Sequence, residues 1–456
     1  MEKGVITHNV NGVKGQLIAL LESRNIDEAI KLFVCHADEA QETIKEYDPN
    51  KHSIISREDK IRKDKTDYKT YKLPQNWQQY INEVAVYFFC GKPLKWELNN
   101  EHTEAEALQP TFLKFKRFLQ KLYFDSNINE AKRIAGAETE CAILFAIYND
   151  EGEDKVKMQI LSNGCNDMLY TCFNRYGDMK AFGHKYYLRN FDGEIYERFD
   201  IYLSDYIYEC EQTDKLNAWK VEKRINPIGK IPIIYIRQPK EWEGAERRIE
   251  RIEWADSKNA DVVEYFADPY LKISKKVANK LADAKEVGKL IEVTSKDDVF
   301  DYVTPPEASQ MKTLERSMLK ETILQSTFTP DLSYENIKGM GAISGEAIGK
   351  ANILATMKAN NRRKIYDPLF SRMANLILTI MKEIVFPNDR ANIERLDLRF
   401  VYQSPFGNEL DDNSEELSRL RDAGLLSLEA GVYANRNIDN KEEEIARLKL
   451  EAQEKK

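Results

Sequence analysis

The strongest constraint on the fold is a change in the apolar period near residue 139. Upstream, apolar residues recur at spacings of three and four, as in residues 14–47, which is typical of helices that bury one face. From 139 to 237 the period becomes two, in segments such as CAILFAIYND, MLYTCFNRYG and YERFDIYLS that turn residues separate. After residue 238 the helical period returns. A run of strands between runs of helices predicts an α+β fold.

Two helical patterns, residues 244–266 and 307–327, enclose an insert at 268–306. The insert starts with a lysine-rich helical segment and continues as KLIEVTSKDDVFDYVTPP, which predicts a hairpin turning at Ser295–Asp298. We therefore expect two paired helices that project from a body. The first helix has one apolar stripe, made of Ile249, Ile252, Ala255, Asn259, Val263 and Phe266.

A third helical pattern runs to about residue 384 and contains Pro368, which predicts a kink or a break. Residues 396–404 (LDLRFVYQS) have the pattern of a strand with no neighbour in sequence. We expect this strand to pair with the 139–237 block. Shorter helical patterns cover most of residues 1–75, 76–93, 111–138 and the segment after 405.

Charge and cysteine content narrow the classes of function. The 456 residues include 76 acids and 68 Lys and Arg residues, a net charge of −8, which disfavours a protein that grips nucleic acid tightly but not one that lets it slide. None of the six cysteines forms a CxxC pair, and most lie in apolar segments, so buried free thiols are expected. No apolar run approaches the ~18 residues of a membrane span and no signal-peptide core is present, which predicts a soluble protein made in a cytoplasm.

Residues 56–72 (SREDKIRKDKTDYKTYK) are a run of mixed charge. A solvated connector is one interpretation, and a nucleic-acid patch is the other, which the interleaved acids weaken.

Residues 339–350 (GMGAISGEAIGK) place four glycines ahead of a helix, where phosphate loops occur. A P-loop requires G-x-x-x-x-G-K-[ST], but three residues separate Gly345 from Gly349, and Ala351 stands where the hydroxyl belongs. The dinucleotide pattern G-x-G-x-x-G also fails, because Ser344 occupies its third glycine position. Two interpretations stay open: an ordinary linker, or a flexible loop opening a helix with Ser344 as its N-cap.

The sequence carries no catalytic constellation that we recognise. The five histidines are scattered without metal-ligand spacing, and no GxSxG is present. The pairs Asp297–Asp298 and Asp411–Asp412 lie in predicted turns, where solvated charge is expected. We expect no enzyme, no cofactor and no metal site; a nuclease would need clustered carboxylates or histidines.

Four segments, in this order, resemble the portal proteins of tailed bacteriophages, of the siphophage type. Residues 73–93 (LPQNWQQYINEVAVYFFCGKP) are similar to an early helix that ends in Gly-x-Pro, and NPIGKIPIIYI to the segment before the first stem helix. SGEAIGKANILATMKANNRRKIYDPLF is similar to the opening of a long kinked helix, and LSRLRDAGLLSLEAGV to a segment near the end. The resemblance covers roughly residues 45–445, and the N-terminal 45 residues and the short C-terminal tail depart from it.

The resemblance implies a portal fold with an α/β wing, a two-helix stem, a small α/β clip, a tunnel loop with a long kinked helix, and a C-terminal helical crown. The implied boundaries are 1–243 for the wing, 244–267 for stem helix 1, 268–306 for the clip, 307–330 for stem helix 2, 331–345 for the tunnel loop, 346–384 for the kinked helix, 385–404 for the return strand to the wing, and 405–456 for the crown and tail.

The family's function implies a ring, usually of twelve copies, at one capsid vertex of the virion, through which double-stranded DNA is packaged and ejected. The implied partners are further copies of the chain, the DNA, the terminase large subunit, a head-completion adaptor, and the capsid and scaffold proteins. The implied tunnel-loop residues are Asn336, Lys338, Gly339, Met340, Gly341, Ser344, Gly345 and Lys350. The implied docking residues of the clip are Glu292, Thr294, Lys296, Asp297 and Asp298. In the stem, charged residues off the apolar stripe are available for the channel or for ion pairs between neighbours, with a solvated face as the alternative: Glu246, Arg247, Glu250, Arg251 and Glu253.

The composition fits a second class of function equally well, a non-viral intracellular α+β scaffold or adaptor with helical arms. The mass of the purified protein in solution separates the two, because only the portal predicts a large ring.

Overall fold

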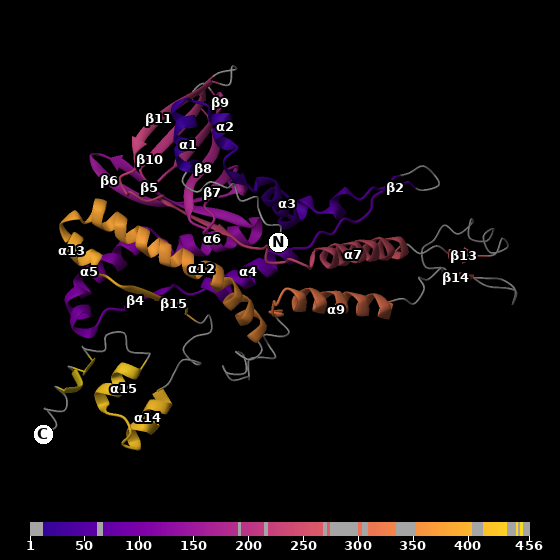
Figure 1. The fold of residues 1–456 in the computed structure, drawn as a ribbon. Helices are drawn as coiled ribbons and strands as arrows, with labels where there is room; N and C mark the ends of the chain where they lie inside the picture. The colour runs from indigo at the N-terminus through magenta and orange to yellow at the C-terminus, as the bar shows by residue number, and fades with distance from the viewer. Residues whose placement is uncertain are drawn as a thin grey trace. The chain divides into compact units, whose positions relative to one another are not determined.

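The computed structural model of the 456-residue chain describes residues 12–61, 67–189, 193–213, 218–267, 271–273, 300–302, 309–333, 352–403, 414–435, 444–445 and 447–449. It confirms the predicted α+β class (Figure 1). The chain forms two compact units. Unit 1 comprises Met1–Thr43, Asn82–Glu241 and Phe328–Lys456, and unit 2 comprises Ile44–Ile81 and Trp242–Thr327.

Unit 1 contains a six-stranded antiparallel sheet of order β1-β7-β8-β9-β10-β11. Its apolar residues on one face pack under helices α1 (Gly12–Glu22) and α2 (Ile26–Ile30), where Phe33 meets Phe199 edge to face. Gly183 is required on this face, because a Cβ there would lie 2.6 Å from the Phe199 ring. The strands are β1 (Val34–Cys35), β7 (Met168–Phe173), β8 (Met179–Arg189), β9 (Ile195–Tyr202), β10 (Tyr206–Thr213) and β11 (Ala218–Ile225).

The second sheet has the order β12-β5-β6 and is buried on both faces along β5. Its strands are β5 (Glu140–Asp150), β6 (Glu153–Leu161) and β12 (Ile233–Arg237). Ala142 and Leu144 face the six-stranded sheet, whereas Ile143 and Phe145 face the helices α5 (His102–Lys121), α6 (Phe124–Glu138) and α12 (Ile353–Ile380). Because successive side chains of a strand point to opposite faces, a strand between two cores needs an unbroken apolar run, which CAILFA supplies.

The strand predicted at 396–404 forms as β15 (Leu398–Val401), but the expected pairing with the 139–237 block is wrong. It pairs antiparallel with β4 (Lys95–Leu98), which the sequence did not suggest as a strand. Phe400 stands opposite Trp96 with ring centroids 5.7 Å apart, and both rings pack into the core around Phe370 and Phe115. This aromatic packing selects the partner strand.

Two helical expectations change in detail. The stretch expected at 111–138 begins at His102 and is divided by Tyr123, whose φ of 49° is left-handed and separates α5 from α6. α12 is continuous through Pro368, so the expected break is wrong, and a π-helical turn, Met381–Val385, follows it. Pro368 and Lys364 are both exposed, so water can satisfy the carbonyl that the proline cannot.

The remaining elements of unit 1 are short. Residues Pro387–Asp389 form a 3-10 turn, and α13 (Arg390–Glu394), α14 (Ser414–Asp422) and α15 (Leu428–Ala434) follow. The six cysteines are free, as expected, but Cys35 and Cys165 are exposed, because one lies on a two-residue edge strand and the other in a turn. Among the described residues, no helix is long and apolar enough to cross a membrane.

Unit 2 is built around α7 (Glu246–Ala267) and α9 (Ser309–Ser326), which lie side by side (Figure 1). Ala245, Ile249 and Ile252 pack with Ile323 and Trp242, so the first half of the predicted stripe is buried. Further along α7, Asn259 and Val263 of that stripe are exposed. Strand β13 (Leu271–Ile273) pairs with β14 (Phe300–Tyr302), a pairing that was not predicted.

The N-terminal part of unit 2 departs from the helical expectation for residues 1–75. Helix α3 (Ala37–Tyr47) begins in unit 1 and ends in unit 2. Two 3-10 turns follow it, Pro49–Lys51 and Ser53–Ser56. Residues after 56 form the short strands β2 (Lys60–Ile61) and β3 (Asp67–Tyr68) and then an extended segment up to α4 (Trp77–Cys90).

Candidate functional site

The tunnel-loop and clip residues that the sequence nominated for function lie outside the described part of the chain. This holds for the tunnel-loop candidates Asn336, Lys338, Gly339, Met340, Gly341, Ser344, Gly345 and Lys350, and for the clip candidates Glu292, Thr294, Lys296, Asp297 and Asp298. The described elements next to these segments are α7, α9 and the start of α12. Two clusters of buried polar contacts hold α7 and α12.

The first cluster lies in unit 2, where the extended residues 71–75, here called the strap, run antiparallel to α7. Alternate backbone N–H groups of the strap donate to α7 side chains that are four residues apart. The pairs are Tyr71 N to Asp261 Oδ1 (2.8 Å), Leu73 N to Ser257 Oγ (3.0 Å) and Gln75 N to Glu253 Oε1 (2.8 Å).

The spacing of these pairs follows from backbone geometry. Two residues of extended chain advance about 6.6 Å, and their N–H groups point to the same side. Four residues of helix advance about 6.0 Å and return to nearly the same face. The two repeats therefore stay in register over three contacts, and the strap lines α7 along about two turns.

Ion pairs anchor both ends of the strap contact. At one end His52 Nδ1 lies 2.7 Å from Glu253 Oε1, and both side chains are buried. At the other end Arg57 pairs with Asp261, also buried, and its Nη1 donates to the carbonyl of Tyr71 (3.0 Å). A buried carboxylate that is paired with a cation and also accepts a backbone N–H has its charge compensated, which lowers the cost of burying it.

The strap corrects two expectations from the sequence. Glu253 was assigned to a channel, a neighbour or solvent, but it is 2% exposed and is occupied by His52 and Gln75. The solvated-connector interpretation of residues 56–72 fails at Arg57 and Thr70, which are buried. The sequence signal was E-x₃-S-x₃-D at 253–261, a polar row beside the apolar stripe.

The His52–Glu253 pair predicts a pH dependence for unit 2. Burial alone would lower the pKa of His52, but the hydrogen bond and charge of Glu253 outweigh it, and the pKa is raised above 6.5. Folding therefore favours the protonated ring: the stability is fully present below about pH 6.5 and is lost as the pH rises through the higher folded pKa.

We expect the thermal midpoint of unit 2 to fall across that pH window in the wild type and to fall less in His52→Asn. Calorimetry at a series of pH values measures this. His36→Gln is the control, because burial lowers the pKa of His36, so its removal should leave the loss in place. Identical pH profiles for wild type and His52→Asn would contradict the assignment.

The second cluster lies in unit 1 around Glu241, the last residue before the chain enters unit 2. Three cations surround its carboxylate: Lys132 Nζ at 2.5 Å, Lys358 Nζ at 3.0 Å and Arg362 Nε at 3.2 Å. The Lys132 and Glu241 side chains are fully buried. Burial alone would raise the pKa of Glu241, but the three cations reverse the effect and hold it far below 4.5.

In the Glu241 cluster, as in the strap contact, side chains four residues apart on one helix bind a neighbouring segment; here the helix is α12. Lys358 also donates to the carbonyl of Glu241 (2.8 Å), and Tyr366 donates to Gln238 Oε1 (2.9 Å). Lys358, Arg362 and Tyr366 follow one another at intervals of four residues, so they share one face of α12. This face binds the segment 238–241, which precedes α7 in the chain. Polar contacts thus fix the start of α12 and the chain that precedes α7.

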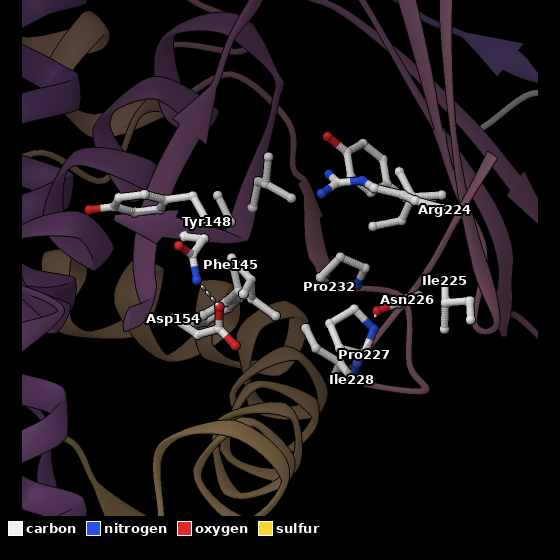
Figure 2. Close-up of a pocket in the computed structure, with 15 residues that line it drawn as sticks. Phe145, Tyr148, Asp154, Arg224, Ile225, Asn226, Pro227, Ile228 and Pro232 are labelled. Carbon is white, nitrogen blue, oxygen red and sulfur yellow. Dashed lines mark hydrogen bonds between the residues drawn. The ribbon is translucent and has the colours of Figure 1, made fainter. Parts of the chain in front are cut away.

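In both clusters the buried carboxylates are paired with cations, and those of the strap also accept from backbone N–H groups. A cavity of about 360 Å³ in unit 1 lies between β5 and the segment 224–232 (Figure 2). Its Asp154 accepts a hydrogen bond from Asn149 (2.9 Å), and its Arg224 pairs with Glu209 (2.8 Å). Within the described residues, no group of three or more His, Cys, Asp or Glu could hold a metal ion.

Comparisons with known proteins give one family. The model of a family described as phage portal protein, SPP1 Gp6-like, matches residues 36–456. Among solved structures, a chain of the virion of a native gene transfer agent (GTA) particle superposes with a TM-score of 0.36 at 10% identity, over 77% of this chain and 86% of that chain. No curated protein sequence matches the chain. The family model spans nearly the whole chain and is the finding that bears on function.

Proposed function

The chain belongs to the phage portal proteins of the SPP1 Gp6-like family, and we propose that its copies form a ring, about twelve in number, at one vertex of the virion capsid. Double-stranded DNA passes through the ring during packaging and ejection. The family match over residues 36–456 carries this proposal.

Within the proposed ring, α7 and α9 are the stem and residues 268–306 are the clip that docks the terminase large subunit and later the head-completion adaptor. Residues 331–345 are the tunnel loop, residues 346–384 the long helix behind it, and residues 405–456 the crown. The remaining parts, residues 1–243 and 385–404, are the wing, which meets capsid and scaffold proteins. The family is a structural one, so the ring itself carries no catalysis and the terminase supplies the ATPase.

Two features of the described residues support the proposal that α7 and α12 are held rigidly in place. The strap secures α7 on one side while α9 covers another, and three cations fix Glu241 against α12. Buried ionic and backbone contacts resist sliding, because moving one partner leaves a buried charge unpaired. The net charge of −8 suits a channel wall that must not hold DNA, since each phosphate contact adds affinity.

Assembly tests the proposal directly. Size-exclusion chromatography with light scattering should give a mass about twelve times the 53.0 kDa of one chain, because a ring with identical head-to-tail contacts closes on itself. Negative-stain images of that fraction should show rings with a central hole. A chain that stays at the mass of one or two copies at every concentration would contradict the portal ring and favour the scaffold interpretation.

A further inference from the structure

One exposed face of α9 is apolar, although this helix already contacts α7 through the apolar residues Leu319 and Ile323 and through polar residues. Lys312, Glu315 and Arg316 reach α7, at Asn259 (3.1 Å), Arg251 (2.6 Å) and Asp256 (3.2 Å). Three large apolar residues at helical spacing point elsewhere, Met311, Leu314 and Met318, with exposed fractions of 76%, 61% and 59%. An amphipathic helix normally buries its apolar side, so this arrangement indicates a partner.

These three residues line an open groove of about 380 Å³. The other lining residues are Glu315, Leu319 and Thr322 of α9 and Arg248, which belongs to α7. From Gln310 to Thr322 no residue of α9 is buried. We call Met311, Leu314 and Met318 the α9 stripe.

A second exposed apolar surface of unit 2 lies on the strap, where Tyr71 and Leu73 are each 39% exposed. The strap contacts α7 through Glu253, Ser257 and Asp261, whereas α9 contacts it through Arg251, Asp256 and Asn259. At about 100° per residue, the centres of these two sets are about 160° apart around α7. The strap and α9 therefore lie on nearly opposite sides of the same helix.

The two surfaces also lie at the same level along α7. The α9 residues are held beside positions 251–259, and Tyr71 and Leu73 beside positions 261 and 257. A closed ring needs two different surfaces on opposite sides of each copy, and its rotation joins them without displacement along the axis. Surfaces at equal level meet this condition for helices that run along the ring axis.

We propose that the α9 stripe of each copy packs on the strap of the next copy, with Tyr71 and Leu73 packing against Met311 and Leu314. The proposal rests on the portal ring proposed above and names the contact that closes it. The strap thus has two roles: its N–H groups hold α7 of its own chain, and its side chains receive the neighbour.

Charge substitution tests the contact. The double variant Leu314→Lys, Met318→Lys places two cations on the stripe and should reduce the mass from that of the ring to that of one chain, with an unchanged circular dichroism spectrum. The matched control is Ser317→Lys, which adds a cation at an exposed position of α9 off the stripe and should keep the ring. A double variant that still forms the wild-type ring overturns the proposal.

Cross-linking supplies a test that does not depend on disrupting the ring. In a background with the exposed thiols removed, Cys35→Ser and Cys165→Ser, the pair Leu73→Cys, Leu314→Cys should give covalent multimers on oxidation, and either single substitution should not. If the wild type forms rings but the double cysteine variant gives no such multimers, the proposed contact is overturned and the portal ring stands. A wild type that does not assemble overturns the portal ring itself. A ring unaffected by the lysine variants but deficient in binding terminase or adaptor would assign the stripe to that partner and also overturn the proposal.

Discussion

Replacing Glu241 with alanine is expected to lower the free energy of unfolding of unit 1 by about 3–5 kcal/mol, the range found when one partner of a buried ion pair is removed. The variant leaves Lys132, whose side chain is fully buried, beside Lys358 and Arg362 with no carboxylate among them. Three cations then repel one another in a region of low dielectric. The effect should be larger than the loss of any single exposed ion pair of this chain.

Denaturant unfolding followed by tryptophan fluorescence measures this change. Glu243→Ala is the matched control, because Glu243 is an exposed acid two residues away and its removal should change stability by less than about 0.5 kcal/mol. Adding Lys358→Met and Arg362→Met to Glu241→Ala should restore part of the loss by removing the stranded charge. Equal stabilities for Glu241→Ala and Glu243→Ala would show that the cluster does not contribute to the free energy of unfolding.

The second large effect is expected for Asp261→Ala in unit 2. This change strands the buried guanidinium of Arg57 and removes the acceptor of the Tyr71 N–H, so the strap should detach from the distal turns of α7. The expected loss is again about 3–5 kcal/mol. Amide exchange in a peptide covering residues 69–76 should accelerate by about two to three and a half orders of magnitude, because a loss of 1.4 kcal/mol corresponds to a factor of about ten.

Hydrogen exchange with mass spectrometry reports this opening locally. Glu264→Ala is the control, since Glu264 is exposed and accepts from the hydroxyl of Tyr71 (3.3 Å) but from no backbone N–H of the strap in the described contacts, and it should leave exchange in the strap nearly unchanged. If Asp261→Ala exchanges like the control, the strap is held by its apolar contacts and the polar ladder is secondary. Because the strap is also the proposed receiving surface, Asp261→Ala should weaken the ring as well.

Local patterns in the sequence were sufficient for the elements whose burial follows a period. The segments from CAILFAIYND onwards predicted the strands of the 139–237 block, and the spacing of Ile249 and Ile252 predicted the buried face of α7, because side-chain direction repeats every 2 residues in a strand and about every 3.6 in a helix. The order of four motifs predicted the portal family, which the family model confirms. The hairpin of α7 and α9 followed from two helical patterns with an insert between them.

The tertiary structure alone decided which polar groups are buried and which strands are paired. Glu253, Arg57 and Glu241 look like surface charges in the sequence, yet each meets partners brought together from distant segments, such as His52 to Glu253 and Lys132 to Glu241. β15 found β4, about 300 residues earlier in the chain, through Phe400 and Trp96. Periodicity records which side of an element is apolar, but the free energy of burying a charge depends on the partner that the fold supplies.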